Sequence, residues 1–515
     1  MQAGPGPRGP WSAPFANMCR PNLDILVIAD THHTRRGDVT PPGASRRTFR
    51  DGPLFVRKAL LRLKHEGIAP GLIVLLGDLL EDGRDPSAEA ELGKLAEELQ
   101  RANTPFLVVP GNHDASAERI ARIFGCAPGL HEAGGYGFLV FHDRYEADDR
   151  TCRSPDDLAL PAATAAQRPG LPLIALQHNP LHPRIEEPYP YMPENAEAIL
   201  ASYRAAGVVL SLSGHYHAGQ AVHEVNGTLC FTAPAACEAP YRFARVRLDG
   251  RRIAIRELAL QMDVHGLVDV HCHTEMAYCR HDVAAEADAA VARTLGVQRV
   301  CLVEHAFQLY LPPEAAWSWR WQTDAAMVQR AFRGGRGRMD EYRRLARRLR
   351  SEFVRAGLEA DLLDSGELFL AGEDRPGWDL IVGAIHAVNG ETRARSQAEA
   401  ERLFMRDAER LLAQPINVLA HPFRFFLRGG HRRPAHLYAA LAGLLAARGV
   451  AAEINFHVNA PDPRFIEECL SRGVKLALGS DAHDMAEVGE FAPHLRVLSE
   501  AGVKPAEFAR VLYAP

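Results

Sequence analysis

Cysteine is scarce and follows no pattern in this sequence. The 515 residues include nine cysteines, and no two of them form a CxxC pair or part of a regular framework. An odd number of scattered cysteines in a long chain is typical of reduced thiols. We therefore expect a cytoplasmic protein rather than a disulfide-stabilised secreted one.

Long apolar runs are missing as well. No stretch is long enough to cross a bilayer, so the sequence predicts no membrane-spanning helix and no membrane partner. The opening residues, MQAGPGPRGPWSAP, are rich in glycine and proline and lack the hydrophobic core of a signal peptide. We expect residues 1–21 to form a disordered leader.

Neither sign of charge dominates the chain. The net charge is −5, and no half is strongly basic. Nucleic-acid binding depends on a basic surface, so this balance disfavours a nucleic-acid partner without excluding a nuclease with a local groove. The apolar content of 47% is enough for more than one core, and the length indicates two or three domains.

Apolar runs of strand length recur in the first half, and each ends in side chains that bind metals. The first run, residues 23–29, leads into Asp30, Thr31, His32 and His33. Alternate residues at a strand end point the same way, so Asp30 and His32 can share a metal ion. The later runs end in Gly77-Asp78, Gly111-Asn112-His113-Asp114, His178 and Gly214-His215-x-His217.

Helical stretches separate the first few of these runs. Residues 54–67 and 88–103 have apolar side chains three and four positions apart. Alternating strands and helices predict a largely parallel sheet, and ligands gather beyond the carboxyl ends of such strands. Residues 244–258 predict a closing hairpin that turns at Asp249-Gly250. We therefore expect a first domain over residues 22–258 with one metal site.

The second half repeats this organisation in a new set of strand-like runs. Seven runs carry potential ligands at or near one end, namely His271 and His273; Glu304 and His305; Glu359; His386; His421; Glu453 and His457; and Asp481 and His483. Helical stretches lie between them. This pattern predicts a small α/β barrel over residues 264–512, with its site at the carboxyl ends of the strands.

The five groups of the first half, in this order, resemble the calcineurin-like metallophosphoesterase superfamily. The resemblance covers residues 22–258 and implies an α/β sandwich with two divalent metals. It implies that Asp78 bridges the metals, with Asp30, His32 and His217 on one and Asn112, His178 and His215 on the other. His113 would stabilise or protonate the leaving oxygen, with Asp114 orienting it. His33 falls outside the pattern and is not expected to be a ligand.

The segments HCHTEMAYCRH, VEHA, GLEADLL, GAIHA, LAHPF and GSDAH resemble the PHP superfamily, named after polymerase and histidinol phosphatase. They look most like its histidinol-phosphate phosphatase-type branch. The resemblance implies a distorted (β/α)7 barrel with three metals, and Glu359 would bridge two of them. The other ligands would be His271, His273 and Asp481 for one metal, His386 and His421 for the next, and His281, His305 and His483 for the third.

Several residues near these motifs are given other roles. Glu304 matches a motif residue that is not usually a ligand, Cys272 is expected in the core, and Arg424 is a candidate phosphate contact. Two closely spaced divalent cations can neutralise the charge that develops on a transferring phosphoryl group. Nitrogen and oxygen ligands without thiolate suit manganese, iron or zinc in both sites.

A segment between His305 and Glu359 departs from the PHP pattern. Residues 306–345 contain Trp317, Trp319 and Trp321, followed by an arginine-rich stretch. The segment can be a lid or substrate wall, or a packed insertion followed by a solvated helix. Its unusual composition argues against histidinol phosphate itself as the substrate.

The two resemblances together imply a bifunctional metal-dependent phosphoester hydrolase of a small-molecule substrate. The first domain would be a phosphodiesterase or phosphatase and the second a phosphomonoesterase. Two alternatives stay open. The chain can be a nuclease acting on DNA or RNA, or one domain can be catalytic while the other is a metal-stabilised regulatory or binding module. The sequence does not indicate an oligomeric state.

Overall fold

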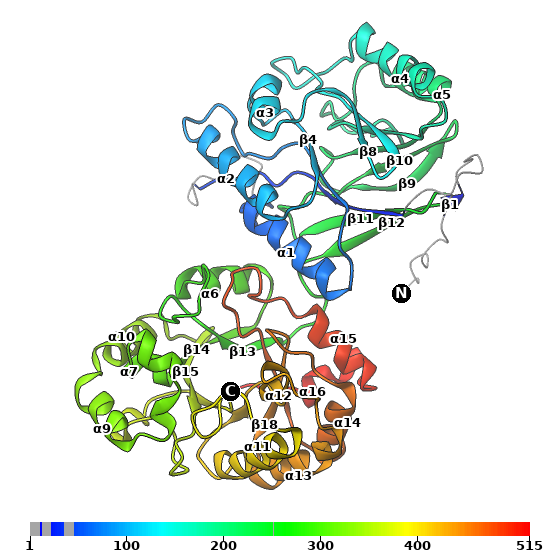
Figure 1. Cartoon of the computed structure of the whole chain (residues 1–515). Coiled ribbons are helices and arrows are strands. Elements are labelled where there is room, and N and C mark those ends of the chain that lie inside the picture. The colour runs from blue at the N-terminus through cyan, green and yellow to red at the C-terminus, as the bar shows by residue number, and fades with distance from the viewer. Residues whose placement is uncertain (1–10, 13–21, 36–45, 251) are drawn as a thin grey trace. The chain divides into compact units, whose positions relative to one another are not determined.

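A computed structural model of the chain describes residues 11–12, 22–35, 46–250 and 252–515 (Figure 1). Of the expected disordered leader, residues 1–21, only strand β1 (Trp11–Ser12) is described. It pairs with β12 (Arg252–Ala259). Contacts divide the chain into two compact units, Met1–Gln261 and Met262–Pro515. No described helix is long and apolar enough to span a bilayer.

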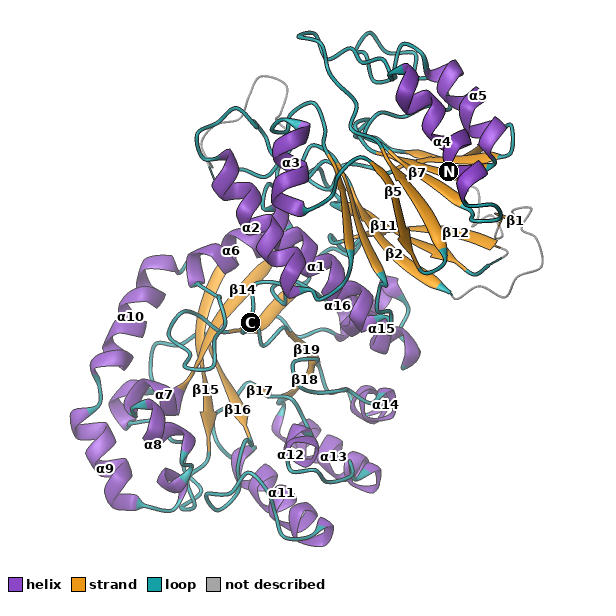
Figure 2. Cartoon of the chain, turned by 45° about the horizontal axis from the view of Figure 1, so that its top comes forward, coloured by secondary structure: helices purple, strands orange, loops and turns teal. Residues whose placement is uncertain are grey.

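Two six-stranded sheets form the centre of the first unit (Figure 2). In spatial order, the strands of the first sheet are β1, β12, β11 (Arg242–Leu248), β2 (Leu23–Ile28), β3 (Leu72–Leu76) and β4 (Phe106–Val109). The second sheet contains β5 (Gly129–Ala133), β6 (Tyr136–Val140), β7 (Leu173–Leu176), β8 (Val208–Ser213), β10 (Thr228–Thr232) and β9 (Gln220–Val225). The expected hairpin joins β11 to β12.

Parallel strands at the middle of each sheet determine where the ligands of the first unit meet. Strands β2, β3 and β4 are parallel to one another, and so are β6, β7, β8 and β10. Strands β3 and β7 are buried at every position, as expected of strands covered on both faces. The helices of this unit are α1 (Gly52–His65), α2 (Ala88–Arg101), α3 (Ala117–Phe124), α4 (Pro155–Gln167) and α5 (Ala196–Ala206).

The second unit contains one seven-stranded sheet in which every strand is parallel to its neighbours and follows chain order (Figure 2). Its strands are β13 (Val268–Cys272), β14 (Arg299–His305), β15 (Val354–Asp361), β16 (Leu380–Ala384), β17 (Val418–Leu419), β18 (Ala451–Asn455) and β19 (Leu476–Gly479). The Asp481 amide donates to the His271 carbonyl at 2.6 Å, next to a parallel bridge between Cys272 and Ala482. These contacts join the first strand to the last and nearly close the sheet into the predicted barrel.

Helices surround the barrel strands in Figures 1 and 2. They are α6 (Ala285–Thr294), α7 (Ala306–Tyr310), α8 (Pro313–Trp317), α9 (Ala325–Gly334), α10 (Gly337–Leu349), α11 (Gln397–Leu411), α12 (Arg424–Arg428), α13 (Tyr438–Arg448), α14 (Pro463–Ser471), α15 (Ala492–Glu500) and α16 (Phe508–Val511). Short 3-10 helices are η1 (Arg320–Gln322), η2 (Gly372–Asp374), η3 (Ala435–Leu437) and η4 (Pro505–Glu507). The predicted fold class, an α/β sandwich followed by a seven-stranded barrel, is confirmed.

The tryptophan-rich segment is partly packed and partly exposed. Trp321 is fully buried, donates from its indole to the Ala316 carbonyl at 3.0 Å, and stacks on Phe307 with ring centroids 5.3 Å apart. Trp319 is also buried, whereas Trp317 is 40% exposed. The segment therefore anchors itself in the core through two tryptophans and presents the third at the surface.

Candidate metal centres

The first cluster lies beyond the carboxyl ends of parallel strands in the first unit. All seven predicted ligands are there, with Asp30 and His32 after β2, Asp78 after β3, Asn112 after β4, His178 after β7, and His215 and His217 after β8. Asp78 is central, because its Oδ1 lies 3.4 Å from His178 Nε2 and its Oδ2 lies 3.6 Å from His32 Nε2. Its two oxygens thus face different imidazoles, which is the arrangement a bridging carboxylate needs.

The other ligands close around Asp78. His32 Nε2 and His217 Nε2 are 3.2 Å apart, and His217 Nε2 lies 3.9 Å from Asp30 Oδ1. The His178 and His215 rings have centroids 4.6 Å apart. Ligand atoms of Asp78, His178 and His215 all lie within 4.8 Å of one another. The residues form two overlapping groups that share Asp78.

The backbone around the first cluster has unusual conformations. Asp30, His32 and Asp78 have φ of 55°, 42° and 48°, in the left-handed region that side chains other than glycine rarely adopt. Such strain concentrates at functional sites. At Gly111 a Cβ would stand 2.2 Å from Asp78 Oδ1, and at Gly77 2.3 Å from His178 Nδ1. The ligands therefore pack directly against backbone that has no room for a side chain.

Unpaired buried atoms test whether this cluster fits divalent cations. Asn112 Oδ1, His178 Nε2 and His215 Nε2 are buried and make no hydrogen bond among the described residues. His178 Nδ1 instead bonds to the Leu76 carbonyl at 2.7 Å. A metal-binding histidine is usually held in this way through its other nitrogen, which leaves the free nitrogen directed at the ion. The residues therefore fit a cation at this position.

Charges within the first cluster are strongly coupled. Burial favours neutral Asp78, but His178 and His32 hold the pKa of its carboxyl well below the usual range. Burial lowers the pKa of His178, but the Asp78 carboxylate more than offsets it and raises that pKa to about 9. Asp78 and His178 therefore stabilise each other's charged forms.

His113 and Asp114 lie beside the first cluster in different environments. The His113 amide donates to Asp78 Oδ1 at 3.0 Å, and its ring Nδ1 lies 2.9 Å from the Glu81 carbonyl. The Asp114 carboxylate accepts from the amides of Gly111 and Leu80, at 2.8 and 2.9 Å. Asp114 therefore fixes the backbone of the loop that carries His113, and the Glu81 carbonyl fixes the orientation of the His113 ring. Burial and then the Asp78 charge raise the pKa of Asp114 to about 7.

Three further residues at this cluster lie outside the motifs. Glu238 bonds to His217 Nδ1 at 2.7 Å and orients that ring. Arg47 donates to Glu81 Oε1 at 2.6 Å and lies 3.1 Å from His32 Nδ1. The Tyr189 hydroxyl accepts from Asn112 Nδ2 at 3.3 Å. Their loops carry no recognisable spacing, so the sequence offered no signal for them. His33 bonds to the Arg50 carbonyl at 3.0 Å through Nδ1 and has no evident ligand role.

The second cluster surrounds Glu359 inside the mouth of the barrel. Glu359 Oε1 lies 2.8 Å from His421 Nε2 and 3.4 Å from His386 Nε2. Its Oε2 lies 2.5 Å from His305 Nδ1 and 3.6 Å from His271 Nε2. His273 Nε2 lies 3.8 Å from Oε2 as well, so Oε1 faces two imidazoles and Oε2 faces three. Glu359 is fully buried, and the surrounding histidines hold its pKa well below the usual range despite that burial.

The remaining predicted ligands of the barrel complete this cluster, with one exception. His273 Nε2 lies 3.0 Å from Asp481 Oδ1, and its ring stacks on His305 with centroids 4.3 Å apart. Ligand atoms of His273, His305 and His483 lie within 4.8 Å of one another. The exception is His281, whose side chain lies outside the cluster.

Carboxylates outside the cluster fix several of these imidazoles. His271 Nδ1 bonds to Glu453 at 2.9 Å, and His386 Nδ1 bonds to Asp361 at 3.0 Å. His271 Nε2 is buried without a hydrogen bond among the described residues. As in the first unit, a histidine is held through one ring nitrogen while its other, buried nitrogen makes no hydrogen bond. The residues of the barrel therefore also fit a cation.

The structure does not bring His281 into the second cluster. Its side chain is 68% exposed, and its Nδ1 pairs with Asp484 at 3.0 Å. Cys279 takes a position beside the cluster instead. Its Sγ lies 3.0 Å from His483 Nε2 and 3.4 Å from His305 Nε2. The two residues are only two positions apart, so a small change in the path of the loop decides which of them faces the histidines.

Two other barrel residues have clear partners. Glu304 accepts from the Thr274 amide and hydroxyl at 2.7 and 2.5 Å, so it braces the loop after β13. Arg424 donates to Asp481 Oδ2 at 2.6 Å and to His386 Nε2 at 2.9 Å. The charge of Arg424 is thus already paired with a cluster carboxylate.

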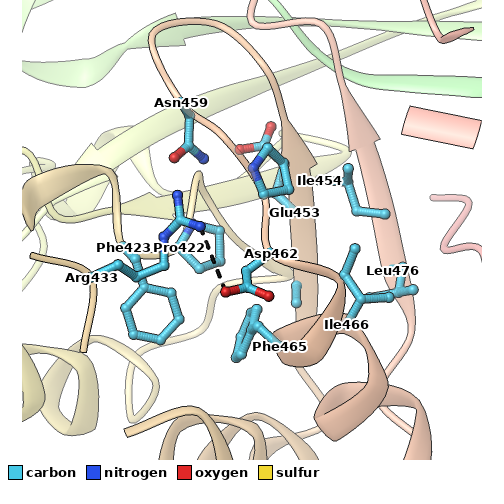
Figure 3. Close-up of a pocket in the computed structure, with 12 residues that line it drawn as sticks. Pro422, Phe423, Arg433, Glu453, Ile454, Asn459, Asp462, Phe465, Ile466 and Leu476 are labelled. Carbon is cyan, nitrogen blue, oxygen red and sulfur yellow. Dashed lines mark ion pairs between the residues drawn. The ribbon is translucent and has the colours of Figure 1, made fainter. Parts of the chain in front are cut away.

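A small pocket next to the second cluster is drawn in Figure 3. Phe423, Asn459 and Phe465 line it, together with the ion pair between Arg433 and Asp462 at 4.0 Å. Its volume is about 20 Å³. A cavity of that size holds about one water molecule, so this pocket is not a substrate site.

A family comparison bears directly on the first unit. Residues 23–219 match the family model described as calcineurin-like phosphoesterase. The N-terminal half is a calcineurin-like metallophosphoesterase domain. The first cluster lies within the matched region, so this metallophosphoesterase domain is a metal-dependent phosphoester hydrolase.

A curated relative covers the other part of the chain. It is a "Probable histidinol-phosphatase" of Deinococcus radiodurans, 27% identical over 278 residues, which are 47% of this chain and 96% of the relative. The PHP-type resemblance inferred from the barrel motifs is confirmed alongside that of the metallophosphoesterase domain.

Solved structures similar to the chain include two phosphatases. One is a dimetal phosphatase from Danio rerio, 19% identical, covering 46% of this chain and 96% of its own, with a TM-score of 0.41. Another is a purple acid phosphatase from yellow lupin seeds, 12% identical, covering 47% of this chain and 52% of its own, with a TM-score of 0.34.

Proposed function

We propose that the chain is a bifunctional phosphoester hydrolase. The metallophosphoesterase domain is a two-metal phosphodiesterase or phosphatase, and the barrel is a three-metal phosphomonoesterase. In this proposal the first site opens a small-molecule phosphodiester and the second removes the resulting monoester. One observation carries the proposal. Both clusters hold buried ligand atoms without hydrogen bonds, on side chains that are fixed from behind by carboxylates or carbonyls.

The ligands proposed for the first site are Asp30, His32 and His217 for one cation and Asn112, His178 and His215 for the other. Asp78 is the shared ligand, because its two oxygens face different imidazoles. Divalent cations held there supply positive charge that polarises a phosphoryl oxygen and stabilises the transition state. Burial of the ligands excludes water and strengthens that effect.

The ligands proposed for the barrel are His271, His273 and Asp481 for one cation and His386 and His421 for the next. The third is held by His305 and His483, with Cys279 in the position for which the sequence predicted His281. Glu359 is shared, because Oε1 faces His386 and His421 while Oε2 faces His271 and His305. A thiolate among imidazoles favours zinc at that third position.

His113 is proposed as the group that stabilises or protonates the leaving oxygen at the first site. The Glu81 carbonyl holds Nδ1 at 2.9 Å, so proton transfer to the substrate falls to Nε2. His113→Ala is expected to lower turnover by about 10²–10⁴-fold, the usual contribution of a general acid. The loss should shrink for a nitrophenyl ester, because nitrophenolate leaves without a proton.

The control for His113→Ala is its metal content, measured beside its turnover on good and poor leaving groups. Metal content should match that of the unaltered protein, because both proposed cations keep their side-chain ligands. A missing metal equivalent, or an equal loss on both substrates, contradicts the assignment of His113 as a general acid.

Metal analysis of the full-length protein tests the proposal as a whole. Protein purified without chelator is expected to contain about five divalent cations, two in the first half and three in the second. A chelator should abolish both activities and lower the melting temperature, because a cation that binds only the folded state stabilises it. Full activity in metal-free protein would end the proposal.

The choice between Cys279 and His281 has its own spectroscopic test. In cobalt-substituted protein a thiolate ligand gives a charge-transfer band in the near ultraviolet, which imidazole and carboxylate ligands do not give. Cys279→Ser is expected to remove this band, and His281→Ala is expected to leave it in place, because its ring is exposed and paired with Asp484.

A second cysteine makes the control for this test. The Cys237 sulfur lies within 4.8 Å of ligand atoms of His32 and His217 in the first cluster. Cys237→Ser should keep the band if Cys279 is the ligand. A band lost in Cys237→Ser and kept in Cys279→Ser would instead place the thiolate in the first site.

A further inference from the structure

A cavity opens directly onto the second cluster and has no carboxylate in its lining. Its volume is about 140 Å³, far more than one water molecule needs. The lining residues are Cys279, His305, Phe307, Trp317, Trp319, His386, Arg424, Arg428, His457, Val458 and His483. We call this cavity the barrel pocket. It joins proposed metal ligands to aromatic and apolar side chains, so it is large enough and suitably placed to receive the leaving group of a substrate.

One wall of the barrel pocket is aromatic. Trp319 stacks on His386 with ring centroids 5.7 Å apart and an interplanar angle of 30°. Phe307 packs against Trp317 at 6.0 Å and against Trp319 at 5.0 Å. The wall is thus continuous from a proposed metal ligand out to the exposed face of Trp317. A flat ring attached near the phosphate can lie along it.

Val458 also lines the barrel pocket, and it is an apolar residue in a strained backbone conformation. Val458 is 65% exposed and has φ of 47°, which a β-branched residue rarely adopts. Trp319 has φ of 56° on the aromatic side. Such conformations cluster at ligand sites, where the surrounding structure holds them in place. Two residues that line the same pocket therefore have this rare conformation, which indicates a built binding site rather than incidental packing.

Two arginines line the barrel pocket, and they differ in whether their charge is paired. Arg424 is paired with Asp481, but the Arg428 side chain makes no hydrogen bond or ion pair among the described residues. A guanidinium without a partner beside the cluster can bind a phosphate oxygen. An ammonium group on the substrate, in contrast, would meet no carboxylate in the lining. The pocket therefore favours an anion that carries an uncharged ring.

We propose that the barrel pocket selects phosphate monoesters whose leaving group carries a flat, uncharged aromatic ring, and that it disfavours leaving groups with an ammonium group. The phosphate lies at the cluster and Arg428, and the ring lies along the aromatic wall of Trp317 and Trp319. This inference rests on the proposed phosphomonoesterase function of the barrel. It goes further by naming the leaving group and by assigning the tryptophan-rich segment a role in substrate selection.

Binding of phosphonates measures the pocket independently of hydrolysis. Phenylethylphosphonate, butylphosphonate and aminoethylphosphonate share a phosphonate and an alkyl linker, and none of them can be hydrolysed as an ester. Calorimetry on the full-length, metal-loaded Asp78→Asn protein is the measurement, because that variant weakens the first site. Stacking and burial of one ring predict that phenylethylphosphonate binds about 10- to 100-fold more tightly than butylphosphonate. Aminoethylphosphonate should bind more weakly than butylphosphonate.

Three variants separate the ring contact from the phosphate contact. Trp317→Ala should reduce the preference for the phenyl compound to near unity, and Trp317→Phe should restore most of it. Arg428→Gln should weaken all three ligands to a similar extent and keep the preference. Leu427→Ala is the matched control, because Leu427 is an exposed apolar residue on the same helix that does not line the pocket.

The outcomes distinguish this inference from the proposed function. Equal affinities for the phenyl and butyl compounds, or a preference unchanged in Trp317→Ala, overturn the inference even if the protein hydrolyses monoesters. A preference that depends on Trp317 supports the inference. If no corresponding monoester is hydrolysed in that case, the phosphomonoesterase assignment fails while the ring-binding pocket stands.

Discussion

Asp78→Asn is expected to abolish hydrolysis at the first site and to leave hydrolysis at the second unchanged. Asp78 is buried, and its two oxygens lie 3.4 and 3.6 Å from imidazoles of different groups. An asparagine keeps the shape but loses the charge and one of two equivalent oxygens. Loss of a residue that merely orients a ligand costs about 10–100-fold in activity, so loss of a shared ligand should cost more than about 100-fold.

The measurement is turnover of a phosphodiester and of a phosphomonoester by the same purified full-length variant. Asp156→Asn is the matched control, because Asp156 is an exposed aspartate in the first turn of α4, far from the ligand loops along the chain. It should leave both activities intact. Loss of both activities in a folded Asp78→Asn protein would show that the two sites depend on each other.

Glu359→Gln is expected to abolish hydrolysis at the second site and to leave hydrolysis at the first site unchanged. Glu359 is fully buried in the barrel, and five proposed ligands approach its two oxygens. The amide of glutamine cannot balance the charge of several cations, so we expect monoester hydrolysis to fall by more than about 100-fold. Diester hydrolysis should stay at the level of the unaltered protein.

The same two substrates check Glu359→Gln, with Glu500→Gln at the exposed end of α15 as its control. Metal analysis should show a loss confined to the second half, with the two proposed cations of the first half retained. Normal monoester hydrolysis by Glu359→Gln would remove Glu359 from the site. It would also leave the barrel without its proposed shared ligand.

The sequence predicted the architecture because most of the proposed ligands lie near or just after the end of a run of apolar residues. A strand buried on both faces has a near-continuous apolar sequence, and its polar end is conspicuous. Asp78 after LIVLL and His421 after the short strand β17 are examples. The parallel order of the barrel strands also follows from the alternation of strand-like and helical stretches, which the structure confirms.

Loop conformation is what the sequence could not supply. His281 fits a motif, but the turn after β13 exposes its ring and directs Cys279 to the histidines. Arg47 reaches His32 from a loop without any spacing signal. Left-handed backbone at ligands such as Asp30 and Asp481 is set by tertiary packing rather than by residue preference. Which side chains gather at the strand ends is therefore largely predictable, whereas the partners that orient them are not.

The hydrogen bond between the Asp481 amide and the His271 carbonyl has a consequence for biosynthesis. Proteins are made from the N-terminus, so the first barrel strand is complete long before the last one leaves the ribosome. Ligands from both strands belong to one cluster, and Asp481 and His483 come last. If these side chains bind cations as proposed, the barrel can hold its full set only after translation has passed residue 483. A chain that ended before residue 481 would keep Glu359 but lack Asp481 and His483, so the proposed barrel site would form completely only in the longer product.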